Sequence, residues 1–358
     1  MKKVGIVTFH RALNYGAVLQ SYALQKTITS LGADCEIVDY ICPKITLDYK
    51  PFRLNKNNLI KSFAKSCVMC RRRAKRRDAF KPFFNNYLVK SKVQYTPENI
   101  DTLKNDYDLF VSGSDQVWSP RCVGFDPAYF LTFANDNQKY SYAASFAVPT
   151  LPQEQIEEYK KRLSGFQKFS VREASGEKLV KELTGREAVT HLDPTLLISA
   201  EAWGKIAVTK VKKPYILVFT ANPQVSLLDF AQKLSKEKNM PIYYINDAPH
   251  VKKNGINYVV APSVEEFVGY FKGAEYVITN SFHGTAFSVI FNRNLFVEFK
   301  NKSGRNIRSE GLLKMLGINR EIVDGNCDET KIDWSDVNLK IKEQSKSSLE
   351  YLRSFTQG

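Results

Sequence analysis

A histidine in a strand-to-helix turn is the residue of this sequence best suited to proton transfer. His283 lies between an apolar segment at residues 276–278 and a second one that begins at Thr285, a pattern that predicts a buried strand, a turn at 280–284 and a helix. The first N–H groups of such a helix attract anions, and an imidazole exchanges protons near neutral pH. This turn is therefore a candidate active site. The alternative interpretation is a histidine that only caps the helix.

Two other turns carry residues suited to acid–base chemistry and to anion binding. Asp115 lies in the turn at 112–118, where small residues let the backbone approach a ligand. It is a candidate acid or base, or else the cap of the next helix. Arg172 ends a predicted strand at 169–173, where its planar guanidinium suits a carboxylate or phosphate. The alternative for Arg172 is an ion pair with Glu173 or another acid.

The first turn of the chain offers a third candidate site. Asn14, Tyr15 and Gly16 follow a predicted strand that ends near residue 9, and they open a predicted helix that Gly32 ends. These three residues can line a pocket at the helix N-terminus. The turn holds one glycine, so the three-glycine dinucleotide fingerprint is missing and we expect neither NAD nor FAD.

The elements that position these turns alternate between strands and helices in both halves of the chain. Strands are expected at residues 35–40, 107–111, 139–147, 169–173, 188–192, 215–219, 242–245, 258–260, 276–278 and 295–299. This alternation predicts an α/β protein with two Rossmann-like parallel-sheet domains.

We expect three regions along the chain. They are an N-terminal domain at 1–208, with a basic helical insertion at about 50–95, a C-terminal domain at 209–330, and a helical tail at 331–358. Ligands bind beyond the carboxyl ends of parallel strands. The turns at 14–16, 113–118 and 281–285 should therefore face one another across a cleft between the domains.

Composition limits the class of protein. The 358 residues are 43% hydrophobic and 25% charged, as in ordinary globular domains. The sequence shows no secretory signal and no run of about 18 apolar residues, so we expect a cytoplasmic location. The six cysteines show no framework spacing. Cys67 and Cys70 form one lone pair, which we interpret as two residues along a helix face, and we expect no metal site.

A net charge of +15 predicts an anionic partner. Residues 61–81 hold nine Lys or Arg against the single Asp78, and their apolar residues recur near helical spacing. This basic amphipathic helix is either a solvated face or a means of peripheral attachment to an anionic membrane surface. The sequence has none of the usual nucleic-acid-binding motifs, so we expect no nucleic acid partner.

Five short motifs occur in a fixed order along the chain. They are Asn14-Tyr-Gly16, Gly113-Ser-Asp115 with Trp118, Val171-Arg-Glu173 with Ser175, Asp193-Pro194, and Ser281-Phe-His-Gly284. Over about residues 4–320 the chain thereby resembles the polysaccharide pyruvyl transferase family. The resemblance implies a fold similar to the B-type glycosyltransferases, phosphoenolpyruvate as donor, and two hydroxyls of a cell-surface or capsular polysaccharide sugar as acceptor, with a glycan or lipid-linked oligosaccharide as partner.

The resemblance also implies roles for residues. Arg172 and His283 fall where the family's key donor-site residues lie. Many members carry a basic residue where this chain has Ser281, and we expect Arg305 or Arg308 to supply that charge. His283 would be the acid, Asp115 the base, and Arg172 would hold the donor, with no cofactor and no metal. The expected substrate-binding residues are Asn14, Tyr15, Gly16, Gly113, Ser114, Trp118, Ser281, Gly284, Thr285, Arg305 and Arg308.

Two other functions fit the same features. A glycosyltransferase that uses a nucleotide sugar would share the architecture, because fold does not fix function. A scaffold without catalytic activity is the other alternative. Binding of phosphoenolpyruvate or of a sugar nucleotide would separate these readings.

Overall fold

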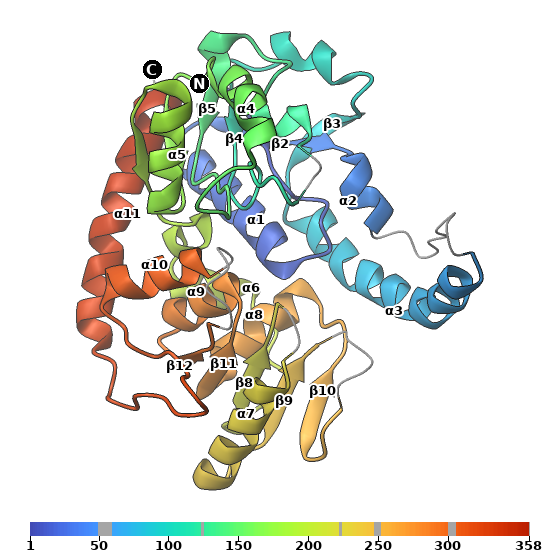
Figure 1. The fold of residues 1–358 in the computed structure, drawn as a ribbon, viewed down its shortest axis with the longest axis vertical. Coiled ribbons are helices and arrows are strands. Elements are labelled where there is room, and N and C mark those ends of the chain that lie inside the picture. Colours follow the sequence, from blue (N-terminus) through green and yellow to red (C-terminus); the bar gives the residue numbers. More distant parts are fainter. Residues whose placement is uncertain (49–58, 123–124, 222–223, 247–251, 300–305, 358) are drawn as a thin grey trace. The chain divides into compact units, whose positions relative to one another are not determined.

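The chain forms two compact units, each with its own parallel sheet (Figure 1). The computed structural model describes residues 1–48, 59–122, 125–221, 224–246, 252–299 and 306–357. Unit 1 comprises Met1–Cys70, Phe84–Leu197 and Lys342–Gly358, and unit 2 comprises Arg71–Phe83 and Ile198–Ile341. The expected domain boundary lies after residue 208, with residues 331–358 as a separate tail.

The sheet of unit 1 has five parallel strands in the order β3-β2-β1-β4-β5. They are β1 (Lys3–Val7), β2 (Asp34–Tyr40), β3 (Lys90–Tyr95), β4 (Leu109–Ser112) and β5 (Lys139–Ser141). Val4 of the central strand lies opposite Cys35 and Leu109. Residues 4–7 are buried, as expected of a parallel strand covered on both faces. A two-stranded sheet of β6 (Phe169–Val171) and β7 (Ala188–Thr190) continues beyond it through a bridge between Ala144 and Val171.

The strand β3 was not predicted, because residues 50–95 were assigned to a helical insertion. The structure has the helix α3 (Leu59–Asn86) in this range, and Lys90–Tyr95 pairs with β2 at the edge of the sheet. Ser91 and Tyr95 are buried, whereas Val93 is 52% exposed. A short, mostly polar edge strand carries little hydrophobic signal, which explains the error.

The helices of unit 1 connect and cover these strands. They are α1 (Tyr15–Ser30), α2 (Pro43–Asp48), α4 (Ile156–Leu163), α5 (Ala174–Thr184) and the last part of α11 (Trp334–Thr356). Single 3₁₀ turns are η1 (Ile100–Asn105), η2 (Pro127–Phe130), η3 (Asp136–Gln138), η4 (Gln153–Gln155) and η5 (Pro194–Leu197). The hydroxyl of Tyr351 in α11 donates to the carbonyl of Ser141 at 2.9 Å, which ties this helix to β5.

The sheet of unit 2 repeats the arrangement in the order β10-β9-β8-β11-β12. Its strands are β8 (Ile216–Phe219), β9 (Ile242–Ile245), β10 (Ile256–Val259), β11 (Tyr276–Thr279) and β12 (Asn294–Val297). Its helices are α6 (Ala200–Ile206), α7 (Val225–Lys238), α8 (Val264–Gly273), α9 (Phe282–Ile290) and α10 (Ile307–Leu316). The predicted fold class, α/β with two parallel sheets, is confirmed.

His191, just after β7, should make the stability of the protein depend on pH. Its ring lies 4.6 Å from that of Tyr351 and its Nδ1 lies 2.9 Å from the Ser170 hydroxyl. Burial lowers the pKa of His191 from 6.5 to about 4. The unfolded chain therefore binds the extra proton between these values, so stability should be fully present above pH 6.5 and fall by up to about 3 kcal/mol as the pH drops to 4.

Urea denaturation of the wild type and of His191→Phe at several pH values between 4 and 7.5 measures this effect. The phenylalanine keeps an aromatic ring against Tyr351 but cannot titrate. We expect the difference in unfolding free energy between the two proteins to grow as the pH rises. A difference that is constant with pH would contradict the assignment.

Candidate active site

Arg172 links two carboxylates at the end of β6 in unit 1. Its Nη1 donates to Asp193 Oδ2 at 2.6 Å and its Nη2 to Asp115 Oδ1 at 3.0 Å. The Arg172 side chain is 1% exposed, that of Asp193 0% and that of Asp115 12%. The alternative of an ion pair with an acid is thus the one observed, with Asp115 and Asp193 as partners. Burial alone would lower the pKa of Arg172, but the two carboxylates outweigh it and raise that pKa.

The turn that carries Asp115 has an unusual backbone. Gly113 has φ +124°, and a Cβ at this position would lie 2.3 Å from the carbonyl oxygen of Tyr142, so no other residue fits without a shift. Asp115 itself has φ 70°, in the left-handed region. Its carbonyl accepts from the N–H of Ser145 at 2.9 Å. The backbone around Asp115 is therefore packed against the segment at residues 142–145, which follows β5.

Buried hydrogen bonds join this turn to the first strand and first helix of the chain. Gln20 of α1 accepts from the Ser114 N–H at 3.2 Å and donates through Nε2 to the Thr8 hydroxyl at 2.8 Å. The Thr8 hydroxyl donates to the Ser114 carbonyl at 3.2 Å. Sequence reasoning missed Thr8 and Gln20, because a buried glutamine in a helix has no distinctive pattern.

Carboxyl groups outnumber basic groups around Arg172. Glu173 Oε1 accepts from the Ser145 hydroxyl and from the N–H groups of residues 146 and 147, at 2.9 to 3.1 Å. Asp193 Oδ1 accepts from the N–H and hydroxyl of Thr195 at 3.0 and 2.7 Å. One guanidinium thus stands among three carboxyl groups. This cluster is suited to accepting a proton from a substrate hydroxyl and poorly suited to binding an anion.

The other predicted residues of unit 1 have structural contacts. Asn14 is exposed and caps α1, since its side chain accepts from the Ala17 N–H at 3.2 Å. Tyr15 and Gly16 are buried inside that helix. Trp118 is fully buried, and its Nε1 donates to the carbonyl of Tyr129 at 3.2 Å. The structure therefore places Trp118 in the aromatic core beneath the Asp115 turn.

In unit 2, His283 lies in the first turn of α9 and is 7% exposed. Ser281 is the N-cap of this helix, with its hydroxyl accepting from the Gly284 N–H at 3.5 Å. The capping role considered for His283 is thus filled by Ser281. A Cβ at residue 284 would lie 2.2 Å from Thr279 Oγ1, so glycine lets α9 pack directly on the end of β11. Thr285 is buried, with its hydroxyl donating to the Ser281 carbonyl at 3.1 Å.

A basic side chain stands beside this turn. The guanidinium carbon of Arg308, in α10, lies 5.7 Å from the ring centroid of Phe282, the neighbour of His283. At this distance the guanidinium and the ring form a cation–π contact. The other candidate, Arg305, lies outside the described residues.

Two charged positions at strand ends were not predicted. Glu298, after β12, is 6% exposed and accepts from the Ser226 hydroxyl at 2.7 Å. In unit 1, Asp39 of β2 contacts His10 and Arg11, which follow β1. Charged residues at or near the carboxyl ends of apolar strands were the available signal, because parallel strands bring such positions to one edge of a sheet.

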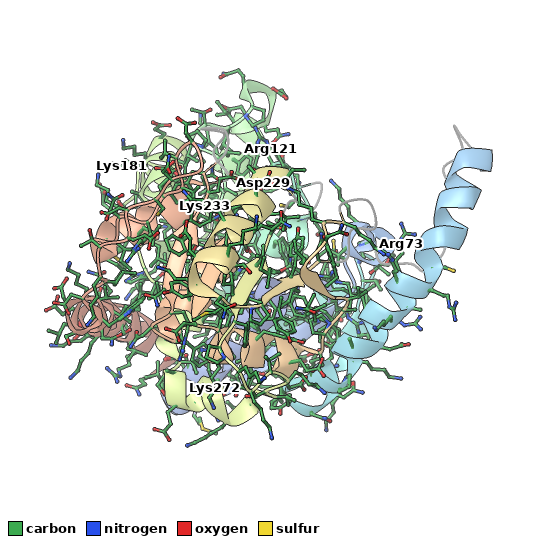
Figure 2. The ribbon with its side chains drawn as sticks, turned by 90° about the horizontal axis from the view of Figure 1, so that it is seen from below. Arg73, Arg121, Lys181, Asp229, Lys233 and Lys272 are labelled. Carbon is green, nitrogen blue, oxygen red and sulfur yellow. The ribbon has the colours of Figure 1, made fainter. Side chains whose placement is uncertain are left out.

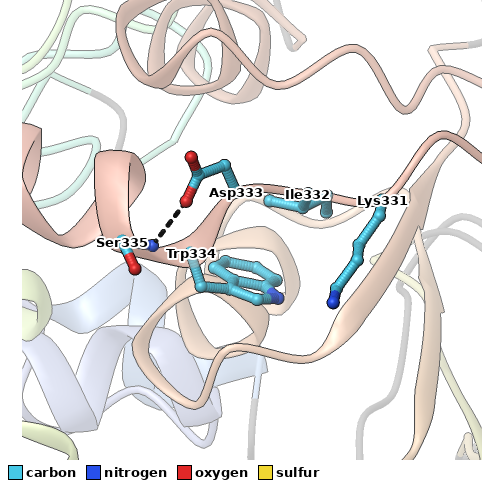
Figure 3. A pocket seen from close by; sticks show the side chains of 5 residues that line it. All are labelled: Lys331, Ile332, Asp333, Trp334 and Ser335. Atoms are coloured by element: carbon cyan, nitrogen blue, oxygen red, sulfur yellow. Dashed lines mark hydrogen bonds between the residues drawn. The ribbon is translucent and has the colours of Figure 1, made fainter.

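A pocket of about 420 Å³ opens at the start of α11 (Figure 3). It is lined by Lys331, Ile332, Asp333, Trp334 and Ser335. Asp333 Oδ1 accepts from the Ser335 N–H at 2.9 Å and so caps the helix. None of the predicted site residues is among the described residues of its wall. The described part of the chain also holds no group of three His, Cys, Asp or Glu side chains placed to bind a metal.

The motifs that carry these turns also identify the family. The model of the polysaccharide pyruvyl transferase family matches residues 14–297. The chain belongs to this family. It is therefore an enzyme, a transferase, and the matched range includes Asp115, Arg172 and His283. Among curated proteins, no sequence matches this pyruvyl transferase significantly.

Solved structures show the same fold at low sequence identity. The UDP-GlcNAc 2-epimerase of Methanocaldococcus jannaschii is 12% identical over 100% of both chains, with a TM-score of 0.53. A putative UDP-N-acetylglucosamine 2-epimerase of Listeria monocytogenes is 8% identical over 94% of both chains, with a TM-score of 0.51. At these identities the likeness concerns the fold of the pyruvyl transferase and does not extend to its substrate.

Loss of Arg172 should destabilise the pyruvyl transferase strongly. Arg172→Ala leaves Asp115 and Asp193 as neighbouring carboxylates without the cation between them, which should cost about 3–5 kcal/mol in the free energy of unfolding. Lys181→Ala is the matched control, because Lys181 forms an exposed ion pair with Glu187 that should contribute less than about 1 kcal/mol. Urea denaturation at pH 7 compares the two. Equal losses of unfolding free energy in the two variants would show that the Arg172 ion pairs stabilise the protein no more than an exposed ion pair does.

Proposed function

We propose that this pyruvyl transferase moves the pyruvyl group of phosphoenolpyruvate onto two hydroxyls of a sugar in a cell-surface or capsular polysaccharide, which forms a cyclic ketal. The observation that carries the proposal is the first turn of α9, where His283 lies next to Phe282 and Phe282 contacts the Arg308 guanidinium. A proton donor, a cation and a helix N-terminus at one turn suit an anionic substrate that must be protonated.

The reaction requires a general acid and a general base. The donor methylene takes up a proton, the oxygen of one sugar hydroxyl adds to the central carbon, and the bond from that carbon to the phosphate oxygen breaks. The second hydroxyl then closes the ring, and the hydroxyl protons pass to a base and to the departing phosphate. We assign the first proton to His283 and the acceptance of a hydroxyl proton to Asp115.

We assign Arg172 a positioning role. The sequence predicted that Arg172 binds the donor. In the structure, two of its guanidinium nitrogens donate hydrogen bonds to Asp115 and Asp193. Arg172 would hold the Asp115 carboxylate ionised and oriented. The negative charge of phosphoenolpyruvate would then be offset by Arg308 and by the N-terminus of α9.

Release of phosphate from phosphoenolpyruvate tests this function, with galactosides, mannosides and glucosides as acceptors. A thermal shift with phosphoenolpyruvate and none with sugar nucleotides is the expected binding result. The reverse result would favour a glycosyltransferase that uses a nucleotide sugar. No response to either ligand, together with no turnover, would favour a scaffold without catalytic activity.

Substitutions should separate the acid from the donor-binding cation. His283→Gln should lower kcat by about 10² to 10⁴ while phosphoenolpyruvate still binds, because a general acid acts mainly in the transition state. Arg308→Ala should instead weaken phosphoenolpyruvate binding by about ten- to a hundredfold, as expected for a lost charge-assisted hydrogen bond. Calorimetric titration and steady-state kinetics measure the two effects. Near-normal turnover of His283→Gln would remove the histidine from the mechanism.

The basic helix α3 suggests where the acceptor is met. Arg71, Lys75 and Arg77 are exposed, and Arg73 lies on the same helix (Figure 2). Among the described helices, none combines the length and apolar composition that crossing a bilayer requires. We propose that α3 attaches the enzyme to an anionic membrane surface that carries lipid-linked acceptors.

Flotation with vesicles tests the attachment. The wild type should float with anionic vesicles at low salt and not at high salt, since each cation contributes up to about 1 kcal/mol near the surface. Exchange of Arg71, Lys75 and Arg77 to Glu should abolish flotation. The same exchange at Lys181, Lys233 and Lys272, which lie on other helices (Figure 2), alters the total charge equally and should have little effect. Equal losses in the two variants would show that bulk charge, and not α3, drives binding.

A further inference from the structure

An arginine, a histidine and an aspartate gather where β1 and β2 end in unit 1, and the mechanism above does not use them. Arg11 donates to Asp39 through Nε at 2.8 Å and through Nη2 at 2.7 Å, a two-pronged pair. His10 Nε2 lies 2.9 Å from Asp39 Oδ1. Burial would raise the pKa of Asp39, but the hydrogen bonds from His10 and Arg11 hold it well below its ordinary value. Asp39 is therefore a fixed anion.

Both ring nitrogens of His10 lie close to oxygen atoms. Nδ1 faces the carbonyl oxygen of Thr8 at 3.2 Å, and Nε2 faces the Asp39 carboxylate. The His10 ring is thereby held beside the Asp39 carboxylate.

The Arg11 side chain reaches the surface. Its side chain is 33% exposed, whereas those of His10 and Asp39 are 2% and 6% exposed. The two bonds to Asp39 use Nε and Nη2, and the Nη1 end of the guanidinium lies on the other side. Neutral groups from β3 complete the surroundings, with Gln94 Nε2 3.3 Å from Asp39 Oδ2 and the Ser91 hydroxyl 2.9 Å from the Asp39 nitrogen. Arg11 is thus an oriented cation whose side chain is partly exposed.

The cluster is joined to the turn of the proposed base. Thr8, whose carbonyl contacts His10, also donates through its hydroxyl to the carbonyl of Ser114, the neighbour of Asp115. Arg11 and the turn of Asp115 therefore belong to connected segments of unit 1. An anionic group bound by Arg11 would lie on the same unit as the proposed base.

We propose that Arg11, held by Asp39, binds a phosphate group in unit 1. A phosphate offers both the charge and the acceptor oxygens that an oriented guanidinium requires, unlike the neutral hydroxyls of a sugar. Under the proposed function the phosphate has two sources, which are the donor and a phosphate on a lipid-linked acceptor. The assignment of a source rests on that proposed function. His10 and Asp39 are positioning residues, because they act through Arg11.

Calorimetric titration with inorganic phosphate tests the site. The titrations use Arg308→Ala as background, which removes the cation assigned to the donor in unit 2. Adding Arg11→Ala should weaken phosphate binding by about ten- to a hundredfold. Adding Lys181→Ala, which also removes a cation paired with one carboxylate, should leave it unchanged. Arg11→Lys keeps a positive charge opposite Asp39 but loses the planar guanidinium, so it should bind phosphate at least about threefold more weakly. This variant replaces Arg11→Ala in the test if the alanine variant does not fold.

Phosphate binding that is equal with and without Arg11, or no phosphate binding in the background protein, overturns the proposal. Kinetics in the otherwise wild-type enzyme then identify the source. A higher KM for phosphoenolpyruvate after Arg11→Ala indicates the donor, and a higher KM confined to phosphorylated acceptors indicates the acceptor. An unchanged KM for both overturns the role in turnover. The titration needs no turnover, so its result stands apart from a failure of the pyruvyl transfer itself.

Discussion

The ion pairs of Arg172 with Asp115 and Asp193 are the interaction on which the candidate site of unit 1 depends. A buried guanidinium must be compensated, and here two carboxylates from different segments of the chain do so at 3.0 and 2.6 Å. The same contacts fix Asp115, which also occupies a left-handed backbone position beside Gly113. The buried ion pairs thereby hold the Asp115 carboxylate, which is 12% exposed, in a defined orientation.

Charge differs between the two candidate sites. Around Arg172 the carboxyl groups are in excess, whereas the first turn of α9 combines His283 with the contact between Phe282 and Arg308. Carboxylates can accept a proton, whereas a cation beside a helix N-terminus attracts anions. The two candidate sites therefore offer different chemistry to a ligand.

The sequence was sufficient for the fold class because both sheets consist of short, buried, apolar strands separated by helical segments. It also located His283, Asp115 and Arg172 at strand ends. The partners of Arg172 were beyond it, since Asp115 and Asp193 lie 57 and 21 positions from Arg172 and meet it through the packing of separate strands. The edge strand β3 was not predicted, and Trp118 was expected to bind substrate although its side chain is fully buried. Both are related cases, because burial depends on what packs against a residue.

The left-handed backbone of Asp115 limits which residues can replace it during evolution. Aspartate, asparagine and glycine tolerate φ near 70° much better than branched or bulky residues do. Gly113 is similarly restricted by the nearby carbonyl of Tyr142. In a homologue that has lost the activity but kept the fold, position 115 should therefore still hold aspartate, asparagine or glycine. The conformation of this loop would then be retained without its catalytic group.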